Sequence, residues 1–538
     1  MDFTWDHFLA HTMRQESLGI TLDTSRFSFP EDYLTTHGPG VAAALAAMEQ
    51  LEGGSIANPD EGRQVGHYWL RAPELAPAGR RGPIAATLEQ IRAFASGVHA
   101  GAIRPTGADR FRNVLVIGIG GSALGPQLLA GALGSSGMRL APFFMDNTDP
   151  AGIQSVLGQV EACGLNETLV VVASKSGGTI ETWNGMCETE ARFRARGLDF
   201  PSHAVAITEG RGRLHERVQT HGWRDWFPLW DWVGGRTSVT SAVGILPAAL
   251  LGLDWEGFLR GAREMDAMTR GRDLRHNPAA RLAVAWYDAG AGRGNRDMVI
   301  LPYSDRLRLL APYLQQLVME SLGKREDLQG HVVHQGLVVY GARGSTDQHS
   351  YLQQLLDGPD NFFLTFVEVL ENEGASPLAV QDECTSGDCL AAFLLGTRKA
   401  LAERGRKTLL LSLDRLDAVS LGAVVALYER AVGLYAQLIG INAYHQPAVE
   451  AMKTGATALR TLQQRMLEQM KSVTGPVRAA QLAAALETTD SEGGAEAVYL
   501  LLRRLAANPA RGIVRIAGVS PDADSFEYRA PQGAGANK

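Results

Sequence analysis

Short apolar runs alternate with helix-compatible segments along the middle of this chain, and this alternation restricts the possible folds more than any other feature. The first apolar runs, mostly β-branched, predict strands at residues 114–117, 142–145, 169–173 and 204–208, with helices between them. Strands that are apolar on both faces and return through a helix belong to a parallel sheet built from right-handed βαβ units. Helices then cover both faces, and ligands bind at the carboxyl ends of the strands.

The alternation starts again after residue 296. Strands are predicted there at residues 297–301, 336–339, 362–369 and 408–413, with helices at 306–322 and 418–440 and a helix start at 351–355. We therefore predict an α/β protein with two tandem doubly wound parallel-sheet domains, an N-terminal helical arm and a C-terminal appendage. The ranges are 1–75 for the arm, 76–270 and 271–453 for the two domains, and 454–538 for the appendage.

The appendage and the overall charge argue against a nucleic-acid partner. Three helical patterns and two short strands, at residues 512–516 and 526–528, resemble a winged-helix module. Its acidic and basic residues are roughly balanced, and the whole chain has a net charge of -7, so few cations are available to pair with phosphates. We expect this module to pack against other parts of the protein and not to bind DNA.

Length and cysteine content predict the class of protein and its compartment. A chain of 538 residues is too long for one hydrophobic core. The four cysteines are too few and too scattered for a disulfide framework or a zinc ligand set, which predicts reduced thiols and a cytoplasmic location. The chain start lacks a signal-like apolar segment, and no apolar run is long enough to span a bilayer, so we expect no membrane partner.

The first strand continues directly into a glycine-rich turn, NVLVIGIGGSALGP at residues 113–126. Glycines bring the backbone close to a ligand, and the first N–H groups of the following helix point at it, so this turn is a candidate anion site with Ser122 as a side-chain ligand. The segment GIGGSA also satisfies the dinucleotide fingerprint in its permissive form. A nicotinamide dehydrogenase with Asp146 as the ribose-binding acid therefore stays open, as does a turn that binds nothing.

A second candidate anion loop follows the third predicted strand, with the sequence SKSGGTIET at residues 174–182. It brings three hydroxyls, a lysine and two glycines to the start of a helix. Hydroxyls and backbone N–H groups each bond a phosphate oxygen, and the helix dipole adds to their effect. An ordinary helix cap needs only one hydroxyl, so the pattern favours a phosphate site.

SKSGGTIET resembles the phosphate loop of the sugar isomerase (SIS) domain, and together with VIGIGGS it is similar to the glucose-6-phosphate isomerase family. Four further stretches follow in the family's order: GGRTS at 234–238, QLVMESLGK at 316–324, GSTDQH at 344–349 and YHQPAVEAMK at 444–453. The resemblance covers residues 66–453. It implies SIS-type domains, no metal, no nucleotide cofactor, and interconversion of glucose 6-phosphate and fructose 6-phosphate by ring opening and cis-enediol proton transfer.

That reaction requires a base that moves a proton between C2 and C1, and Glu320 is our candidate. Gln316 and Glu320 are four residues apart on a predicted helix and therefore face the same way. Without the motif, a solvated glutamate on a helix surface would be the better interpretation of Glu320. The resemblance implies that Gln316 contacts the sugar phosphate, and it implies phosphate contacts from Gly121, Ser122, Ser174, Lys175, Ser176 and Thr179.

Three further catalytic residues are implied by the resemblance. Arg236 would stabilise the enediolate with a permanent positive charge. His349 would assist ring opening from the neighbouring subunit, which implies a homodimer, and Lys453 would assist the same step. Each residue, taken outside its motif, fits an ordinary surface or salt-bridge role.

The chain departs from the family pattern at three positions, which leaves the sugar preference open. Thr237 stands where the family has an aromatic residue, and His445 and Ala448 replace an aspartate and a glycine. Two related functions therefore stay as alternatives. One is a bifunctional phosphoglucose and phosphomannose isomerase. The other is a non-catalytic SIS-type regulator that binds a sugar phosphate, which the joint presence of all four catalytic residues disfavours.

Overall fold

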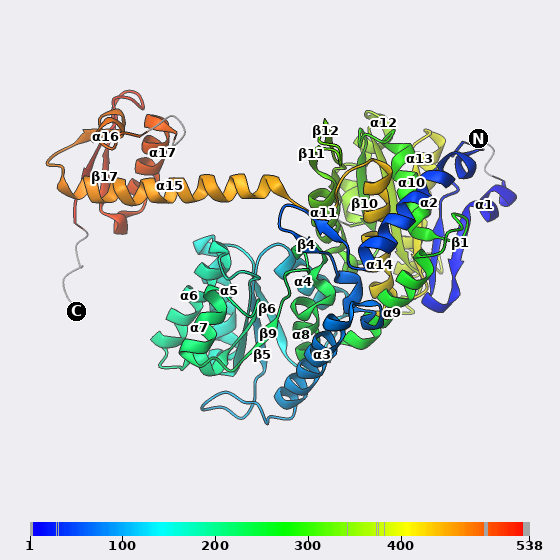
Figure 1. Ribbon diagram of the computed structural model, residues 1–538, viewed down its shortest axis with the longest axis horizontal. Coiled ribbons are helices and arrows are strands. Elements are labelled where there is room, and N and C mark those ends of the chain that lie inside the picture. Colours follow the sequence, from blue (N-terminus) through cyan, green and yellow to red (C-terminus); the bar gives the residue numbers. More distant parts are fainter. Residues whose placement is uncertain are drawn as a thin grey trace. The chain divides into compact units, whose positions relative to one another are not determined.

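The computed structural model describes residues 4–27, 29–30, 32–341, 343–372, 374, 376–380, 382–488 and 493–530. The chain divides into two compact units, Met1–His445 and Gln446–Lys538. The larger unit contains one parallel and one mixed sheet with helices around them, and the smaller unit has a core of its own (Figure 1).

The first sheet consists of parallel strands in the order β6-β5-β7-β8-β9. Their bounds are Asn113–Ile117 for β5, Ala141–Met145 for β6, Thr168–Ala173 for β7, Ala204–Thr208 for β8 and Asp225–Pro228 for β9. The strands predicted at 114–117, 142–145, 169–173 and 204–208 are confirmed. The short edge strand β9 was not expected, because DWFP ends in proline and shows no apolar alternation.

Helices cover both faces of this sheet, and its side chains alternate between two cores. Val114 and Val116 of β5 face one core, and Leu115 and Ile117 face the other. Figure 1 shows α5, α6 and α7 on one face, and α3, α4 and α8 on the other. Their bounds are Ala78–His99 (α3), Gly121–Leu133 (α4), Pro150–Gly164 (α5), Ile180–Ala195 (α6), Arg213–His221 (α7) and Ala242–Leu251 (α8).

The second sheet has the order β1-β2-β15-β14-β10-β13. Its parallel strands are β10 (Asp297–Pro302), β13 (Val339–Tyr340), β14 (Phe362–Val369) and β15 (Thr408–Leu413). The expected strand at 336–339 is shifted to β13, which overlaps it only at Val339. The residues just before it form β12 (Val332–Gln335), which pairs with β11 (Lys324–Glu326) in a separate hairpin. The other three strands of this block are confirmed.

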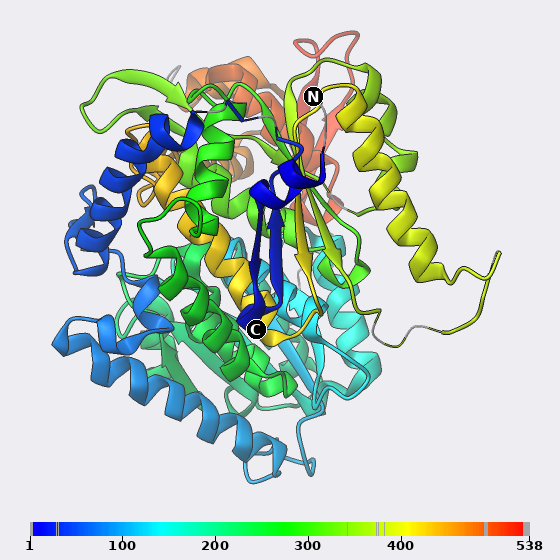
Figure 2. The ribbon, with the colours of Figure 1, turned by 90° about the vertical axis from the view of Figure 1, so that its right-hand side faces the viewer.

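The N-terminal segment adds a hairpin to the helices expected there. β1 (Thr12–Gln15) and β2 (Ile20–Asp23) are antiparallel, and β2 pairs with β15. Figure 2 shows this blue hairpin beside the yellow strand β15. The segment also contains α1 (Trp5–His11) and α2 (Tyr33–Glu52). The beginning of the chain therefore completes the second sheet.

A layer of apolar helices lies between the two sheets. It includes α9 (Trp255–Thr269), α10 (Pro278–Ala289), α11 (Leu310–Leu322) and α14 (Ala418–Leu438). Among the described residues, α14 is the one helix long and apolar enough to cross a membrane, but 94% of its most apolar window is buried inside the protein. α14 is thus a core helix. Its Arg430 shares the buried Asp266 of α9 with Arg71, with Nε–Oδ distances of 2.8 and 2.6 Å.

Helices α12 (Leu352–Asp357) and α13 (Ser386–Glu403) complete the larger unit. The smaller unit contains the helical patterns and the two strands expected near the end of the chain. Its elements are α15 (Pro447–Ser472), α16 (Ala479–Ala485), α17 (Gly494–Ala506), β16 (Val477–Arg478), β17 (Ile513–Ile516) and β18 (Ser525–Tyr528). The strands form an antiparallel sheet around Phe526, which packs in a core with Leu482 and Leu502.

Candidate active site

The first sheet changes direction at β5, and this change creates the place for a ligand. From β5 the chain first adds β6 on one side and then crosses over to β7 on the other. At such a switch point the loops after the two central strands separate and leave a crevice at the strand ends. The two loops that the sequence marks as anion sites, at residues 118–122 and 174–179, are the loops that follow β5 and β7.

The glycines of the first loop permit close contact with two other segments of the candidate site. A Cβ atom on Gly121 would lie 1.9 Å from the carbonyl oxygen of Gly235. Gly120 has a φ of 57°, and a Cβ atom there would lie 3.0 Å from the Gln316 Nε2. The loop after β5 therefore touches both the turn that bears Arg236 and the helix that bears Glu320, and only glycine fits at Gly121.

Helix α11 presents Gln316 and Glu320 together, as their spacing predicts. The Gln316 Nε2 donates a hydrogen bond to the Glu320 Oε1 at 3.1 Å. The Glu320 side chain is 33% exposed, so its carboxylate is held from one side and is open to a ligand on the other. This combination of a fixed position and access is what a general base requires.

Arg236 lies in the short helix η6 (Gly235–Thr240) and is almost fully buried. Its Nε donates to the Ser321 Oγ at 2.8 Å, its Nη2 donates to the Ala443 carbonyl oxygen at 2.5 Å, and its Nη1 lies 3.4 Å from the Glu320 Oε2. Burial lowers the pKa of Arg236, and the neighbouring Glu320 carboxylate opposes this shift. A guanidinium stays charged at neutral pH even so, which gives the site a fixed cation.

The second loop holds its hydroxyls close together at the start of α6. The Ser174 Oγ donates to the Thr179 Oγ1 at 3.3 Å, and the Ser176 Oγ accepts from the Gly178 N–H at 3.2 Å. Thr179 occupies the N-cap position of α6, yet its hydroxyl caps none of the helix N–H groups that the structure describes. Those N–H groups and the hydroxyls together form a suitable environment for a phosphate.

Lys175 contacts protein carbonyls in this structure. Its Nζ donates to the carbonyl oxygens of Asp231 at 2.6 Å and Val233 at 3.0 Å. Burial lowers the pKa of Lys175, and the charge of Arg63 lowers it further. The side chain thus braces the loop against the segment that leads to Arg236, while the backbone of Lys175 stays in the loop itself.

His349 and Lys453 belong to other elements of the chain. His349 is the exposed last residue of η8 (Thr346–His349), where the neighbouring Asp347 accepts from the Arg343 N–H at 2.8 Å and the Tyr351 hydroxyl at 3.1 Å. Lys453 is an exposed residue of α15 in the smaller compact unit. Their catalytic roles remain predictions from the family motifs.

Two of the departures from the family pattern have structural partners. The Thr237 Oγ1 donates to the Gly234 carbonyl oxygen at 3.3 Å, which tightens the turn that holds Arg236. The His445 Nδ1 lies 2.7 Å from an Asp60 carboxylate oxygen, and its carbonyl oxygen accepts from the Arg236 Nη2 at 3.4 Å. His445 therefore fixes the segment behind the arginine.

Lys324 is a site residue to which the sequence analysis assigned no role. Its Nζ donates to the carbonyl oxygens of Glu320 and Ser321, both at 2.8 Å, and the residue is 5% exposed. Burial, with a further contribution from the charge of Arg236, lowers the pKa of Lys324 to about 7. A sequence signal was present, because a lysine just after a helix end and its glycine often bonds the last carbonyls.

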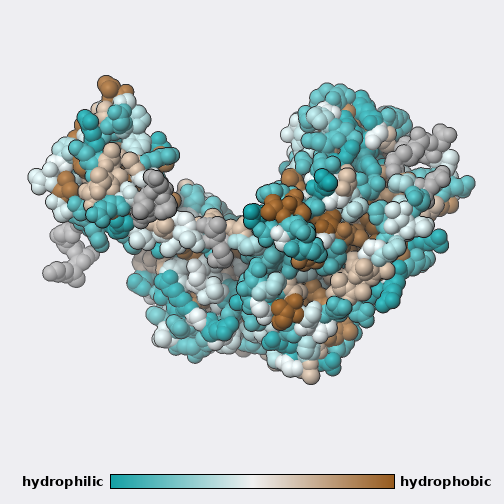
Figure 3. All heavy atoms as spheres, turned by 45° about the horizontal axis from the view of Figure 1, so that its top comes forward, coloured by the Kyte–Doolittle hydropathy of each residue, from teal (hydrophilic) through white to brown (hydrophobic). Residues whose placement is uncertain are grey.

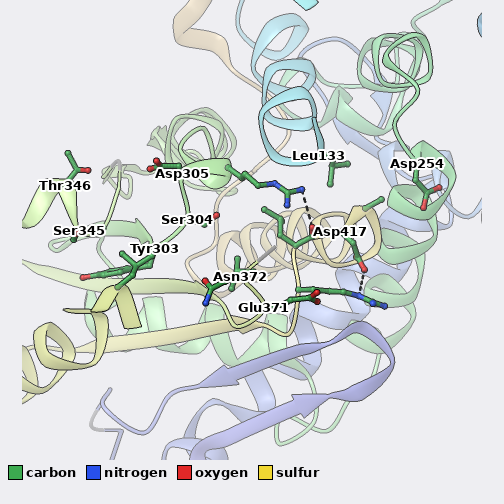
Figure 4. Close-up of a pocket in the computed structure, with 17 residues that line it drawn as sticks. Leu133, Asp254, Tyr303, Ser304, Asp305, Ser345, Thr346, Glu371, Asn372 and Asp417 are labelled. Atoms are coloured by element: carbon green, nitrogen blue, oxygen red, sulfur yellow. Dashed lines mark hydrogen bonds and ion pairs between the residues drawn. The ribbon is translucent and has the colours of Figure 1, made fainter. Parts of the chain in front are cut away.

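The second sheet also has a switch point, and a cavity of about 820 Å³ opens beside it (Figure 4). The cavity lies at the ends of β10, β14 and β15, and none of the predicted site residues lines it. Its lining contains the hydroxyls of Ser304, Ser345 and Thr346 and the carboxylates of Asp254, Asp305, Glu371 and Asp417. Arg415 pairs with Asp417 at 2.9 Å, and the Arg306 Nε donates to the Ala132 carbonyl oxygen at 2.8 Å.

Comparisons with known proteins lead to one family. A family model described as phosphoglucose isomerase matches residues 40–381. A glucose-6-phosphate isomerase of Geobacter sulfurreducens is 52% identical over 511 residues, which cover 95% of this chain and 96% of that protein. A glucose-6-phosphate isomerase of a Cyanothece strain is 52% identical over 516 residues, which cover 95% of this chain and 97% of that protein.

The fold leads to the same family. The crystal structure of a glucose-6-phosphate isomerase from Chlamydia trachomatis matches with a TM-score of 0.78 at 26% identity, over 86% of this chain and 92% of that one. The matched residues 40–381 include the glycine loop at residues 118–122, the hydroxyl loop at residues 174–179, and Arg236, Glu320 and His349. On the strength of these motifs and relatives, the chain belongs to the phosphoglucose isomerase family.

Proposed function

We propose that this chain interconverts glucose 6-phosphate and fructose 6-phosphate, with Glu320 as the base that moves the proton. The observation that carries the proposal is the position of the Glu320 carboxylate, between the Gln316 amide and the buried Arg236 guanidinium, on a helix that touches the glycine loop. A carboxylate can take a proton from C2 and return it at C1 with little movement. Such proton transfer contributes roughly 10²–10⁴-fold to a rate.

Arg236 stabilises the charge that develops during this transfer. Removal of the C2 proton from the open-chain sugar leaves negative charge on the enediolate oxygens. The guanidinium is held by Ser321 and by the Ala443 carbonyl, so it needs no reorganisation when that charge appears. The Glu320 carboxylate lies beside this guanidinium. The group that moves the proton and the group that stabilises the resulting charge therefore act on the same part of the sugar.

The phosphate of the substrate binds between the two loops of the first switch point. The hydroxyls of Ser122, Ser174, Ser176 and Thr179 and the N–H of Gly121 supply hydrogen-bond donors there, together with the first N–H groups of α6. Lys175 supports this loop through its bonds to the Asp231 and Val233 carbonyls. Phosphate binding fixes one end of the sugar, so that C1 and C2 reach Glu320.

A homodimer brings His349 to the active site of the partner subunit, where it assists ring opening. The exposed histidine lies in η8, and the neighbouring Gln348 donates from Nε2 to the Phe393 carbonyl oxygen of α13 at 3.3 Å. Phe393 and Leu395 of α13 are each 54% exposed. Figure 3 shows a mostly hydrophilic surface with separate apolar patches, and exposed apolar residues beside a functional loop favour a subunit interface.

We place the protein in the cytoplasm, because its cysteines are free thiols, three of them exposed, as expected in a reducing compartment. Lys453 would assist ring opening together with His349. This role rests on the family motif at residues 444–453, of which Lys453 is the last residue.

The direct test is turnover of fructose 6-phosphate by the wild type and by Glu320→Gln, coupled to detection of glucose 6-phosphate. Activity in the wild type and a loss of at least about 100-fold in the variant are expected. An inactive wild type, or a variant with an equal rate, would contradict the proposal.

The role of His349 has its own test, which uses mixed dimers. Glu320→Gln and His349→Ala are each expected to be nearly inactive. After the two are unfolded and refolded together, half of the dimers are mixed and contain one intact site, so about a quarter of the wild-type activity should return. Absence of recovery in a sample that sediments as a dimer would contradict a shared site.

A further inference from the structure

The end of helix α11 is held by a buried lysine that the proposed chemistry does not use. The Lys324 ammonium donates to the carbonyl oxygens of Glu320 and Ser321 at 2.8 Å each. Ser321 in turn accepts from the Arg236 Nε at 2.8 Å. Two cations therefore meet at one two-residue segment, one bound to its backbone and the other to its side chain.

This arrangement is costly for stability. Transfer of an ammonium group from water into a protein interior is unfavourable unless a carboxylate pairs with it. The charged groups around Lys324 are Arg236 from η6, Glu320 from α11 and Asp60 from the turn between β3 (Ile56–Asn58) and β4 (Arg63–Gln64). The bonds that the structure gives to the ammonium lead to carbonyl oxygens, and the nearby Arg236 repels it. A group that raises the energy of the folded state in this way is usually retained for function.

We propose that Lys324 is a positioning residue that holds the backbone of Glu320 and Ser321 so that the carboxylate and the Arg236 guanidinium keep their catalytic geometry. The lysine binds the last turn of α11, where carbonyl groups have no partner within the helix. Without it, that turn can unwind toward Gly323, and both the base and the serine that orients Arg236 move together. This inference rests on the proposed role of Glu320.

The ammonium also supplies charge at the correct end of the helix. The carboxyl end of a helix carries partial negative charge, which a cation stabilises. Burial and the charge of Arg236 bring the pKa of Lys324 to about 7, so the ammonium loses its proton far more readily than a surface lysine does. A neutral amine keeps hydrogen-bond donors but not this charge, which gives the residue a second way to affect the site.

The test measures kcat and KM for fructose 6-phosphate in the full chain with Lys324→Met and Lys324→Arg. Methionine has a similar volume but neither donors nor charge. We expect kcat to fall about 100-fold, because a small displacement of a reacting group has an effect of that size. KM should change less than about threefold, because the phosphate loops lie on other elements. Arginine restores the donors and the charge, so the kcat of Lys324→Arg should be about tenfold higher than that of Lys324→Met.

Lys407→Met is the matched control. Lys407 is a half-buried lysine of the same unit that pairs with Asp288 and lies outside the site. It should leave kcat unchanged. In the Ser321→Ala background, Lys324→Met should lower kcat by less than it does in the wild type, because both act on the same segment. Where the methionine variant fails to fold, Lys324→Gln replaces it in the same measurements.

A lysine variant with wild-type kcat, or one whose loss lies entirely in KM, overturns the positioning role. Glu320→Gln measured in parallel separates this outcome from a failure of the proposed function. An inactive Glu320→Gln beside a fully active Lys324→Met rejects only the role of Lys324. A fully active Glu320→Gln rejects the proposed role of Glu320 itself.

Discussion

The parallel strands of the two large sheets follow the same order, but different side chains surround the two switch points. In each sheet the first parallel strand, β5 or β10, lies between the second and the third parallel strand. The first crevice has glycines and hydroxyls at its strand ends, with the buried cation Arg236 close by. The second opens into a cavity lined by the carboxylates of Asp254, Asp305, Glu371 and Asp417. A shared fold therefore supplies the place for a ligand, and the loops decide the chemistry.

This difference explains why the proposed sugar-phosphate site is found only at the first switch point. A phosphate needs hydrogen-bond donors, and the hydroxyl loop at residues 174–179 contributes them. Carboxylates would repel the same group. The second cavity also contains two arginines, but Arg415 pairs with Asp417 at 2.9 Å, and the Arg306 Nε donates to the Ala132 carbonyl oxygen at 2.8 Å. The comparison yields predictions in which a change at the first crevice has an effect and a matched change at the second does not.

The largest expected effect is that of the base. Glu320→Gln keeps the size of the side chain and its bond to Gln316 but removes the proton acceptor, so kcat should fall by roughly 10²–10⁴-fold. Glu371→Gln makes the same change at the second cavity and should leave kcat unchanged. A steady-state assay of both variants checks the pair, and equal losses would mean that the two crevices do not differ in function.

The next effect comes from the glycine loop. Gly121→Ala would place a methyl group 1.9 Å from the Gly235 carbonyl oxygen, so the loop and the Arg236 turn must move apart. We expect kcat to fall about 100-fold, as for other small displacements at a reacting centre. Gly82→Ala in α3 is the control, because no atom lies within 4 Å of its added methyl group. Wild-type kcat in Gly121→Ala would show that the two loops are not rigidly packed.

A smaller effect is expected for single phosphate ligands. Ser176→Ala removes one hydroxyl from the hydroxyl loop, and a hydrogen bond to a charged group contributes about 1.5–3 kcal/mol. KM for fructose 6-phosphate should rise roughly tenfold, with kcat nearly unchanged. Ser304→Ala, at the second cavity, should alter neither constant. A selective fall in kcat for Ser176→Ala would indicate that this hydroxyl acts at the reacting carbons and not at the phosphate.

The sequence predicted those parts of the molecule that depend on local pattern. Strands β8, β14 and β15 lie at the predicted residues, because each is an unbroken run between clear turn signals. The Gln316–Glu320 contact was predictable as well, because four residues correspond to about one helical turn. The family motifs supplied the candidate roles.

The pairing of distant strands and the direction of polar side chains could not be predicted from local sequence pattern. β2 pairs with β15, nearly four hundred residues further along the chain, and no local pattern encodes such a partner. The Lys175 ammonium bonds to two carbonyls of the 231–233 segment, a direction that its loop sequence does not specify. The role of Lys324 depends on its burial against Arg236, which only the folded chain creates.

The smallest expected effect is a pH dependence of stability that Lys324 confers on the first crevice. The unfolded chain holds this proton up to the ordinary lysine pKa of 10.5, whereas the folded chain releases it near a pKa of about 7. Unfolding therefore takes up a proton between these values, so this residue makes the free energy of unfolding rise with pH. One group contributes at most about 1.4 kcal/mol per pH unit.

Chemical denaturation of the wild type and of Lys324→Met at pH 7, 8 and 9 measures this contribution as the difference between the two proteins. That difference should increase in favour of the wild type as the pH rises, whereas Lys407→Met should run parallel to the wild type. A constant difference would mean that the folded and unfolded chains hold this proton equally, so that the lysine stays charged inside the folded protein from pH 7 to pH 9. Its hold on α11 would then include the full ammonium charge at every pH tested, and the first crevice would contain two buried cations, Lys324 and Arg236.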